Sequence, residues 1–320
     1  MEGQQGRRGL VKVGHAELAV GDLGAAREFY VDILGFRETE KTRDRLYLRG
    51  NADADHHCLV LTKGRAPRML HSAWRVASPD DLDLLERRFA AEGHPVRRIE
   101  SGVEAGQGKA IAVVDPCGHP VEFYHEMAKV ESFARKSHLW RGAAVQRLDH
   151  VALITPDVAA GVRHSERMGL HLSESVESED GSGYFAAFLH RTSHSHDVAL
   201  VHGAAPAMQH LSFWVENAAQ VVRAADVVAD AGFSTSIEFG PGRPQDNELL
   251  LPLLERPVRK PHRDLLRGVL VPRLQRTADP LDLRWLPQGR PPLLRRTGSA
   301  ELPRADSRRT GRRMRTMSGA

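Results

Sequence analysis

His15-Ala-Glu-Leu-Ala-Val20 is the stretch that decides the fold, because it returns later in the chain as His150-Val-Ala-Leu-Ile-Thr155. Each copy alternates apolar and polar residues in the way that suits a half-buried β-strand. Each is followed by a helix-like stretch, by a glycine that suits a turn, and by strand-like runs. The helix-like stretches are 23–34 and 158–168, and the strand-like runs are 45–48, 58–61, 183–189 and 197–201.

Two further modules repeat the same opening. They begin at Leu70-His-Ser-Ala-Trp-Arg-Val76 and at Gln209-His-Leu-Ser-Phe-Trp-Val215. We expect their helices at 80–92 and 218–231, because each of these stretches is followed by a glycine of the kind that ends helices. The chain therefore contains four copies of one unit.

The end of the second module completes the pattern. Strands are expected at 111–114 and 121–124, on either side of an Asp-Pro-Cys-Gly turn at 115–118. The order strand–helix–strands, repeated four times, predicts an α+β fold in which paired modules make two domains. Residues 128–144 are the expected linker between them.

Composition places the chain among globular proteins. Its 320 residues allow two domains, and a hydrophobic content of 41% excludes a wholly disordered chain. No stretch approaches the roughly 20 apolar residues of a membrane-spanning helix, and residues 1–14 lack the apolar segment of a secretory signal. Two cysteines, Cys58 and Cys117, cannot form a disulfide framework, so we expect a cytoplasmic protein with no membrane partner.

The net charge of +4 is distributed unevenly along the chain. Residues 244–320 carry 17 Lys and Arg against 8 Asp and Glu, a balance of +9, whereas residues 1–243 carry 28 against 33, a balance of −5. The tail holds 10 of the 18 prolines and no Phe or Tyr, which predicts a disordered Arg/Pro-rich extension. Because Trp285 is its single aromatic residue, the tail lacks stacking platforms, and we expect no nucleic-acid partner.

A histidine stands early in the first strand of every module: His15, His71, His150 and His210. One such histidine is most often a core or surface residue, but four at matched positions of a repeat indicate a shared role. The second module also ends with a carboxylate, Glu122, after its turn. Two imidazoles and one carboxylate on neighbouring strands suit non-haem Fe(II) or Mn(II) and leave open positions for substrate and O2.

The pattern resembles the vicinal oxygen chelate superfamily and, within it, the two-domain extradiol ring-cleavage dioxygenases such as catechol 2,3-dioxygenase and homoprotocatechuate 2,3-dioxygenase. The similarity covers residues 10–243, and its motifs occur in the right order and spacing. The informative motifs are Leu148-Asp-His150, Ala187-Phe-Leu-His-Arg191, His196-Asp-Val-Ala-Leu200, Met208-Gln-His-Leu-Ser-Phe213 and Gly240-Pro-Gly-Arg243.

The resemblance implies four βαβββ modules paired into two vicinal-oxygen-chelate domains, the last module incomplete. The N-terminal domain would span 10–127 and be non-catalytic, the truncated catalytic domain would span 145–243, and the tail would span 244–320. In this family the active metal lies in the C-terminal domain. The complete N-terminal ligand set is then expected to be a relic of duplication.

The resemblance also assigns the site residues. His150 and His210 match the two histidine ligands of the metal, which is Fe(II) or, alternatively, Mn(II). His196 matches the histidine that the family uses to hydrogen-bond oxygen or substrate, and it is the expected catalytic residue. His190 is expected to be a packing neighbour. The remaining histidines of interest are expected at the surface or in turns: His56, His57, His94, His138, His164 and His171.

The implied reaction is the opening of a catechol-type aromatic diol by O2, outside the diol, to give a muconic semialdehyde in aromatic catabolism. Family members often form homo-oligomers, so the resemblance implies one here. Two alternatives keep the superfamily: a glyoxalase-type metal-dependent lyase or isomerase, and a catalytically inactive binding module. The two-domain length and the His196-Asp197 segment speak against the glyoxalase type.

The tail departs from the family after Arg243. The family continues with a histidine, an aromatic-rich strand, an Asp-Pro-x-Gly turn and the glutamate ligand, whereas this chain has Pro244 at the histidine and Arg263 at the ligand. Back-translating Glu255–Arg263 with open third bases and reading one nucleotide later permits Ser-Asp-Pro-Ser-Gly-Asn-Arg-Ile-Glu, the missing turn and ligand. We therefore expect an out-of-frame tail, a weakened Fe(II) site, an open sheet edge and an inactive chain.

Overall fold

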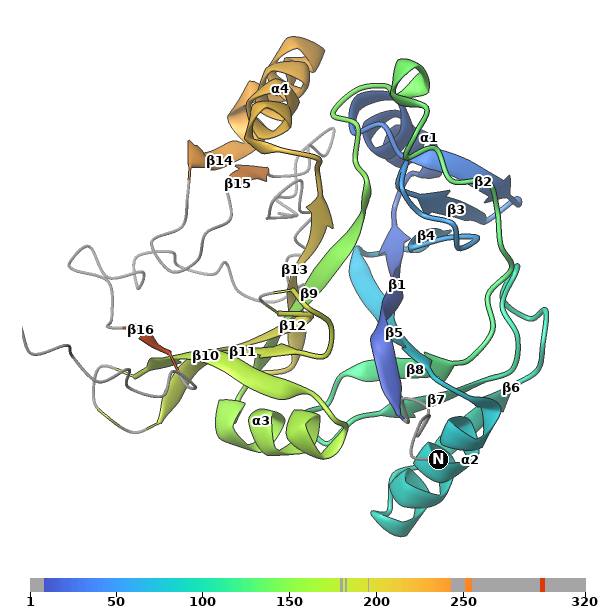
Figure 1. Ribbon diagram of the computed structural model, residues 1–320, viewed down its shortest axis with the longest axis vertical. Coiled ribbons are helices and arrows are strands. Elements are labelled where there is room, and N and C mark those ends of the chain that lie inside the picture. Colours follow the sequence, from blue (N-terminus) through green and yellow to red (C-terminus); the bar gives the residue numbers. More distant parts are fainter. Residues whose placement is uncertain are drawn as a thin grey trace, which may run out of the picture.

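Two β-sheets, each built by a pair of the repeated modules, form the body of the computed structural model (Figure 1). The structure describes residues 9–178, 181, 183–194, 196–242, 251–254 and 294–296. The fold is of the mixed α+β class that the repeat predicts. Most of the tail over 244–320, including Arg263 and its predicted disorder, lies outside the described residues.

The first sheet joins the first two modules through their opening strands. These are β1 (Leu10–Val20) and β5 (Arg68–Val76), which run antiparallel at the centre of the sheet. Each has a parallel neighbour from the end of its own module, β4 beside β1 and β8 beside β5. The sheet order is β2-β3-β4-β1-β5-β8-β7-β6. The outer strands are β2 (Arg37–Lys41), β3 (Arg45–Arg49), β4 (Leu59–Lys63), β6 (Val96–Ile99), β7 (Ala110–Val114) and β8 (Pro120–Tyr124).

The second sheet repeats one side of this plan: the order β10-β11-β12-β9-β13 corresponds to β2-β3-β4-β1-β5 in the first sheet. β9 (Arg147–Thr155) and β13 (Ala207–Trp214) run antiparallel, and β12 lies parallel to β9. The order is β13-β9-β12-β11-β10-β16, so β13 is the last strand of this sheet among the described residues. The remaining strands are β10 (His171–Glu177), β11 (Tyr184–His190), β12 (Val198–His202) and β16 (Leu294–Arg296), with β14 (Ile237–Gly242) and β15 (Leu251–Leu254) in a separate sheet.

The free edge of β13 is the main departure from symmetry. In the first sheet, β8 occupies the equivalent place beside β5 and carries Glu122. Among the described residues, no strand pairs with β13 on that side. The predicted incompleteness of the last module concerns residues that lie mostly outside the described part, and it stays a prediction.

Four α-helices in the described part lie where the repeat predicts them. The side chains of Asp22, Ser78, Asp157 and Asn217 cap their N-termini by accepting backbone N–H bonds. The helices are α1 (Leu23–Arg27), continued by η1 (Glu28–Ile33), α2 (Pro79–Ala91), α3 (Val158–Arg167), and α4 (Ala218–Val228), continued by η3 (Ala229–Phe233). The short 3-10 turns are η2 (Ser137–Leu139) and η4 (Ser234–Ser236). None of the described helices has the length and apolar character needed to span a membrane.

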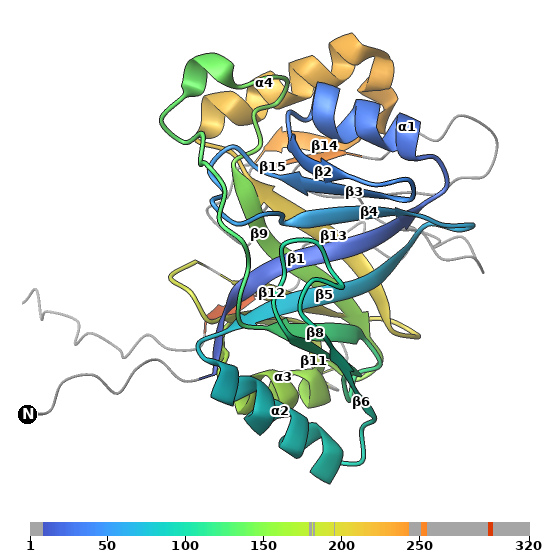
Figure 2. The ribbon, with the colours of Figure 1, turned by 90° about the vertical axis from the view of Figure 1, so that its right-hand side faces the viewer.

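The two halves of the chain share one apolar core. α1 and α4 lie side by side at one end of the molecule, and α2 and α3 lie side by side at the other (Figure 1 and Figure 2). Phe36, which follows η1, meets Phe213 of β13 edge to face with ring centroids 4.8 Å apart. Phe29 and Phe233 meet in the same way at 5.8 Å. These aromatic pairs attach the last module to the first.

We expect Phe36→Ala to destabilise the protein by about 3–5 kcal/mol, because it removes a buried ring from the contact between the halves. Urea unfolding measures the loss, and Val103→Ala is the control, since Val103 is 65% exposed. An unfolding midpoint equal to that of the unaltered protein would show that the two halves do not depend on this contact.

Candidate metal centre

His150 and His210 meet on one face of the second sheet. His150 of β9 lies opposite Ser212 of β13, and His210 lies opposite Ala152, so the two imidazoles are one diagonal step apart. Their Nε2 atoms are 3.1 Å apart. The structure therefore brings together the two residues that the sequence proposes as ligands, and both offer the same ring nitrogen.

Asp149 sets the orientation of the His150 ring. Its Oδ2 lies 2.8 Å from Nδ1 of His150, which puts the ring proton on Nδ1 and leaves the Nε2 lone pair free to bind a metal. Burial would raise the pKa of the Asp149 carboxyl, but the hydrogen bond and the charges of His150, His194 and His196 lower it below its ordinary value. Asp149 belongs to the Leu148-Asp-His150 motif, but no role was predicted for it from the sequence.

His196 lies against the same pair. Its ring centroid is 4.1 Å from that of His150 and 5.1 Å from that of Phe188, and its side chain is buried. Burial, reinforced by the neighbouring His150, lowers the pKa of His196 well below its ordinary value, so its imidazole is neutral near pH 7. Asp197 holds the loop before it by accepting the backbone N–H groups of Arg191 and Thr192.

A third ligand for this pair is not among the described residues. The groups of three potential ligands in the described part both lie in the N-terminal half, and neither includes His150 or His210. By the symmetry of the modules, the counterpart of Glu122 would come from a strand beside β13. The expected position, Arg263, lies outside the described residues.

The N-terminal set is brought together completely. The Nε2 atoms of His15 and His71 are 3.2 Å apart, and Oε2 of Glu122 is 3.9 Å from Nε2 of His71. His57 and Glu104 form a second group of potential ligands with His15. Burial, together with the charges of His57 and His71, lowers the pKa of His15 well below its ordinary value.

Three of the histidines expected at the surface or in turns are buried instead. These are His56, His57 and His164. His56 and His57 lie in the loop before β4, but sequence position alone does not show that this loop folds inward: His57 packs against Tyr47 with ring centroids 5.2 Å apart. His164 lies on the face of α3 that packs near Phe89 of α2.

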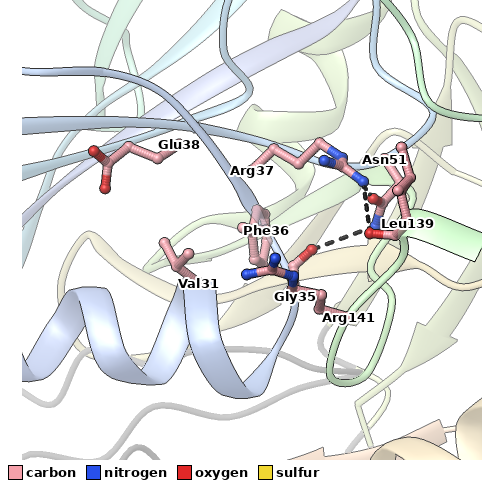
Figure 3. A pocket seen from close by; sticks show the side chains of 8 residues that line it. All are labelled: Val31, Gly35, Phe36, Arg37, Glu38, Asn51, Leu139 and Arg141. Carbon is pink, nitrogen blue, oxygen red and sulfur yellow. Dashed lines mark hydrogen bonds between the residues drawn. The ribbon is translucent and has the colours of Figure 1, made fainter.

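A pocket of about 300 Å³ lies away from both histidine pairs (Figure 3). Arg37 crosses it and donates to the amide oxygen of Asn51 and to the backbone oxygen of Leu139 in the linker. The pocket is lined by Val31, Gly35, Phe36, Arg37, Glu38, Asn51, Leu139 and Arg141. Its lining contains no histidine, and Leu139 and Arg141 of the linker form part of its wall.

The amino-acid sequence is similar to a family of known proteins and to individual members of it. A sequence model of the Glyoxalase/Bleomycin resistance protein/Dioxygenase superfamily matches residues 12–123 and 147–248. A manganese-dependent 2,3-dihydroxybiphenyl 1,2-dioxygenase of Geobacillus genomosp. 3 is 31% identical over 249 residues, which cover 73% of this chain and 78% of the relative. A metapyrocatechase of Pseudomonas sp. (strain CF600) is 29% identical over 247 residues, covering 74% and 80%.

Solved structures agree with the sequence relatives. A complex of homoprotocatechuate 2,3-dioxygenase from Brevibacterium fuscum with 3,4-dihydroxyphenylacetate superposes with a TM-score of 0.75. The two chains are 33% identical, and the alignment covers 78% of each.

We expect the stability of the metal-free protein to fall as the pH is lowered from about 7 to 5. The folded-state pKa of His196 lies below the ordinary value of 6.5, so the unfolded state binds more protons in this range. His196→Asn should make the decline smaller by up to about 1.4 kcal/mol per pH unit. Urea unfolding of both proteins at pH 7 and pH 5 measures the change in the free energy of unfolding. An equal change in the variant and the unaltered protein would contradict a buried neutral imidazole at position 196.

Proposed function

The chain belongs to the Glyoxalase/Bleomycin resistance protein/Dioxygenase superfamily, and we propose that it is an extradiol dioxygenase acting on a catechol-type diol at a metal held by His150 and His210. The observation that carries the proposal is the cluster of His150, His210 and His196 on one sheet face. The names of the related chains support the proposal, since they are a 2,3-dihydroxybiphenyl 1,2-dioxygenase and a metapyrocatechase.

The two imidazoles fit a divalent metal. Two nitrogens about 2.1 Å from one ion and at right angles to each other would lie about 3.0 Å apart. The Nε2 atoms of His150 and His210 are 3.1 Å apart, and Asp149 keeps the His150 proton on Nδ1. We propose Fe(II), with Mn(II) as the alternative, because imidazole ligands suit iron and one of the related chains is named as manganese-dependent. When bound, the metal would supply Lewis-acid chemistry for the diol.

His196 supplies the proton chemistry in this proposal. Its neutral imidazole can donate one N–H to an oxygen of the substrate or of O2 and can accept a proton at its other nitrogen. Phe188 packs against the ring and limits its rotation, while Asp197 holds the loop that leads into it. The ring therefore stands beside His150 in a fixed position, as a proton-transfer group requires.

The proposed substrate is a small aromatic ring with two adjacent hydroxyl groups, and the co-substrate is O2. The related chains support this class, since one is named for 2,3-dihydroxybiphenyl and another was solved with 3,4-dihydroxyphenylacetate. Ring opening beside the diol would give a muconic semialdehyde, a reaction of aromatic catabolism. A glyoxalase-type lyase or isomerase would use the same fold without consuming O2.

With Fe(II), catechol and air, we expect a protein whose residues after 243 are translated in the family's reading frame to consume O2 and give a yellow product, and we expect both to depend on His210. His210→Ala should abolish them by removing a ligand, and His196→Asn should lower kcat by about 10²–10⁴-fold by removing a proton-transfer group. An oxygen electrode and visible absorbance follow the reaction. His202→Ala is the matched control, because His202 is exposed at the end of β12.

We also propose that residues from about 244 onward are translated out of frame. The family match ends at residue 248, β13 has no neighbour on its free edge in the described part, and the shifted reading of 255–263 permits the missing turn and glutamate. The present chain would then hold its metal through two protein ligands and turn over slowly or not at all.

The gene sequence across codons 240–270 should contain, in the shifted frame, codons for the Asp-Pro-x-Gly turn and the glutamate. A protein made in the restored frame should bind Fe(II) at least about 100-fold more tightly than this chain, because a ligand and its supporting contacts return. Absence of those codons would refute the frame proposal. O2 consumption that is absent in the restored protein, or insensitive to His210→Ala, would refute the dioxygenase proposal.

A further inference from the structure

We propose that the N-terminal half holds a second divalent transition-metal ion, bound by His15, His71 and Glu122 and separate from the site of His150 and His210. The three residues come from three adjacent strands, β1, β5 and β8, which lie side by side in the first sheet (Figure 1). This inference does not rest on the proposed ring cleavage.

The register of the strands creates the space for an ion. On β5, Ala73 lies opposite His15 of β1 on one side and opposite Glu122 of β8 on the other. His71 lies two residues from Ala73 and therefore shares its face of the sheet. Because Ala73 has only a methyl side chain, it leaves the three larger side chains around it free to approach one another, and their ligand atoms lie within 4.8 Å of one another.

The ligand atoms are at ion-binding distances from one another. The Nε2 atoms of His15 and His71 are 3.2 Å apart, close to the roughly 3.0 Å expected for two nitrogens on one ion at right angles. Oε2 of Glu122 lies 3.9 Å from Nε2 of His71, and all three ligand atoms lie within 4.8 Å of one another. Two imidazoles and a carboxylate suit Mn(II), Fe(II), Co(II) or Zn(II).

Outer contacts hold two of the ligands in place. Oε2 of Glu17 lies 3.3 Å from Nδ1 of His71, and Thr62 donates to the other oxygen of Glu17. Gln107 donates through Nε2 to Oε1 of Glu122, which leaves Oε2 to face His71. A carboxylate on the far nitrogen of a histidine ligand is the usual arrangement in metal proteins, because it orients the ring and raises its basicity.

Several buried polar atoms around the three ligands make no hydrogen bond in the described part of the chain, although Nε2 of His57 and Oε1 of Glu104 face each other at 4.0 Å. His57 is fully buried, and its Nε2 has no hydrogen bond, although its ring lies 4.6 Å from that of His15. The other unpaired atoms of this chamber are Nδ1 of His15, Oε1 of Glu104, Oε1 of Gln107 and the hydroxyl of Tyr124. Such a concentration of buried polar atoms without hydrogen bonds supports an ion bound among them.

The charge balance points to a cation. Three buried carboxylates, those of Glu17, Glu104 and Glu122, face this chamber. Arg45 contacts Glu17 at 3.6 Å and Glu104 at 3.0 Å. Burying carboxylates without matching positive charge costs free energy. Arg45 supplies one positive charge for the three carboxylates, and a divalent ion beside Glu122 would supply the remaining two. Glu122 and His15 are buried and His71 is nearly so, and this burial, rather than the number of ligands, favours a structural role over a catalytic one.

The test titrates the full-length double variant His150→Ala/His210→Ala, whose C-terminal pair is removed, with Co(II) after treatment with a chelator. We expect one equivalent of Co(II), seen as visible d–d absorption, and a higher Tm with the ion than without it. Adding Glu122→Gln should weaken Co(II) binding at least about 100-fold and remove the Tm increase. Glu126→Gln, which changes an exposed carboxylate nearby, should leave both readouts unchanged.

If Glu122→Gln does not fold, His71→Asn serves as the second variant, because the His71 side chain is 13% exposed and tolerates change better than its buried neighbours. Failure of the double variant to bind Co(II), or equal binding with and without Glu122→Gln and His71→Asn, would overturn the proposal. Neither result bears on ring cleavage, which is measured separately by O2 consumption.

Discussion

The antiparallel register at the centre of each sheet is the constraint on which both candidate sites depend. In each sheet, two histidines on neighbouring strands stand one diagonal step apart, and a small residue, Ala73 or Ser212, lies opposite the first of them. This spacing puts the paired Nε2 atoms 3.2 Å and 3.1 Å apart. Because side chains alternate between the two faces, a slip of one residue would send one imidazole to the other face and destroy the pair.

The two halves use this common frame differently. In the first sheet the supporting carboxylate, Glu17, meets the histidine of the second strand, whereas in the second sheet Asp149 meets the histidine of the first strand. The first sheet continues into β8 and its Glu122, while the second ends at β13 within the described residues. Duplication has therefore left a closed N-terminal cluster and a C-terminal pair that has His196 beside it. The proposed division of labour, structural against catalytic, follows from that difference.

Sequence reasoning predicted what repetition encodes. The four helices, the strand order within modules and the convergence of paired histidines follow from spacing, since cross-strand neighbours are set by local periodicity. It missed His57 and Glu104, because the loops that bury them have no repeat to align. The N-terminal ligand set was expected to be a relic of duplication. That expectation came from the family resemblance, because residue spacing does not show whether a ligand set binds a metal. The unpaired buried atoms around that set are visible only once side chains are placed.

The central claim is that the repeated histidine pairs are metal sites positioned by strand register. Anomalous X-ray scattering from crystals of the full chain grown anaerobically with Mn(II) tests this claim most directly. The account predicts one peak between the Nε2 atoms of His15 and His71 beside Glu122, and a weaker one between those of His150 and His210. Crystals that contain Mn(II) elsewhere but show no peak at either pair would contradict it.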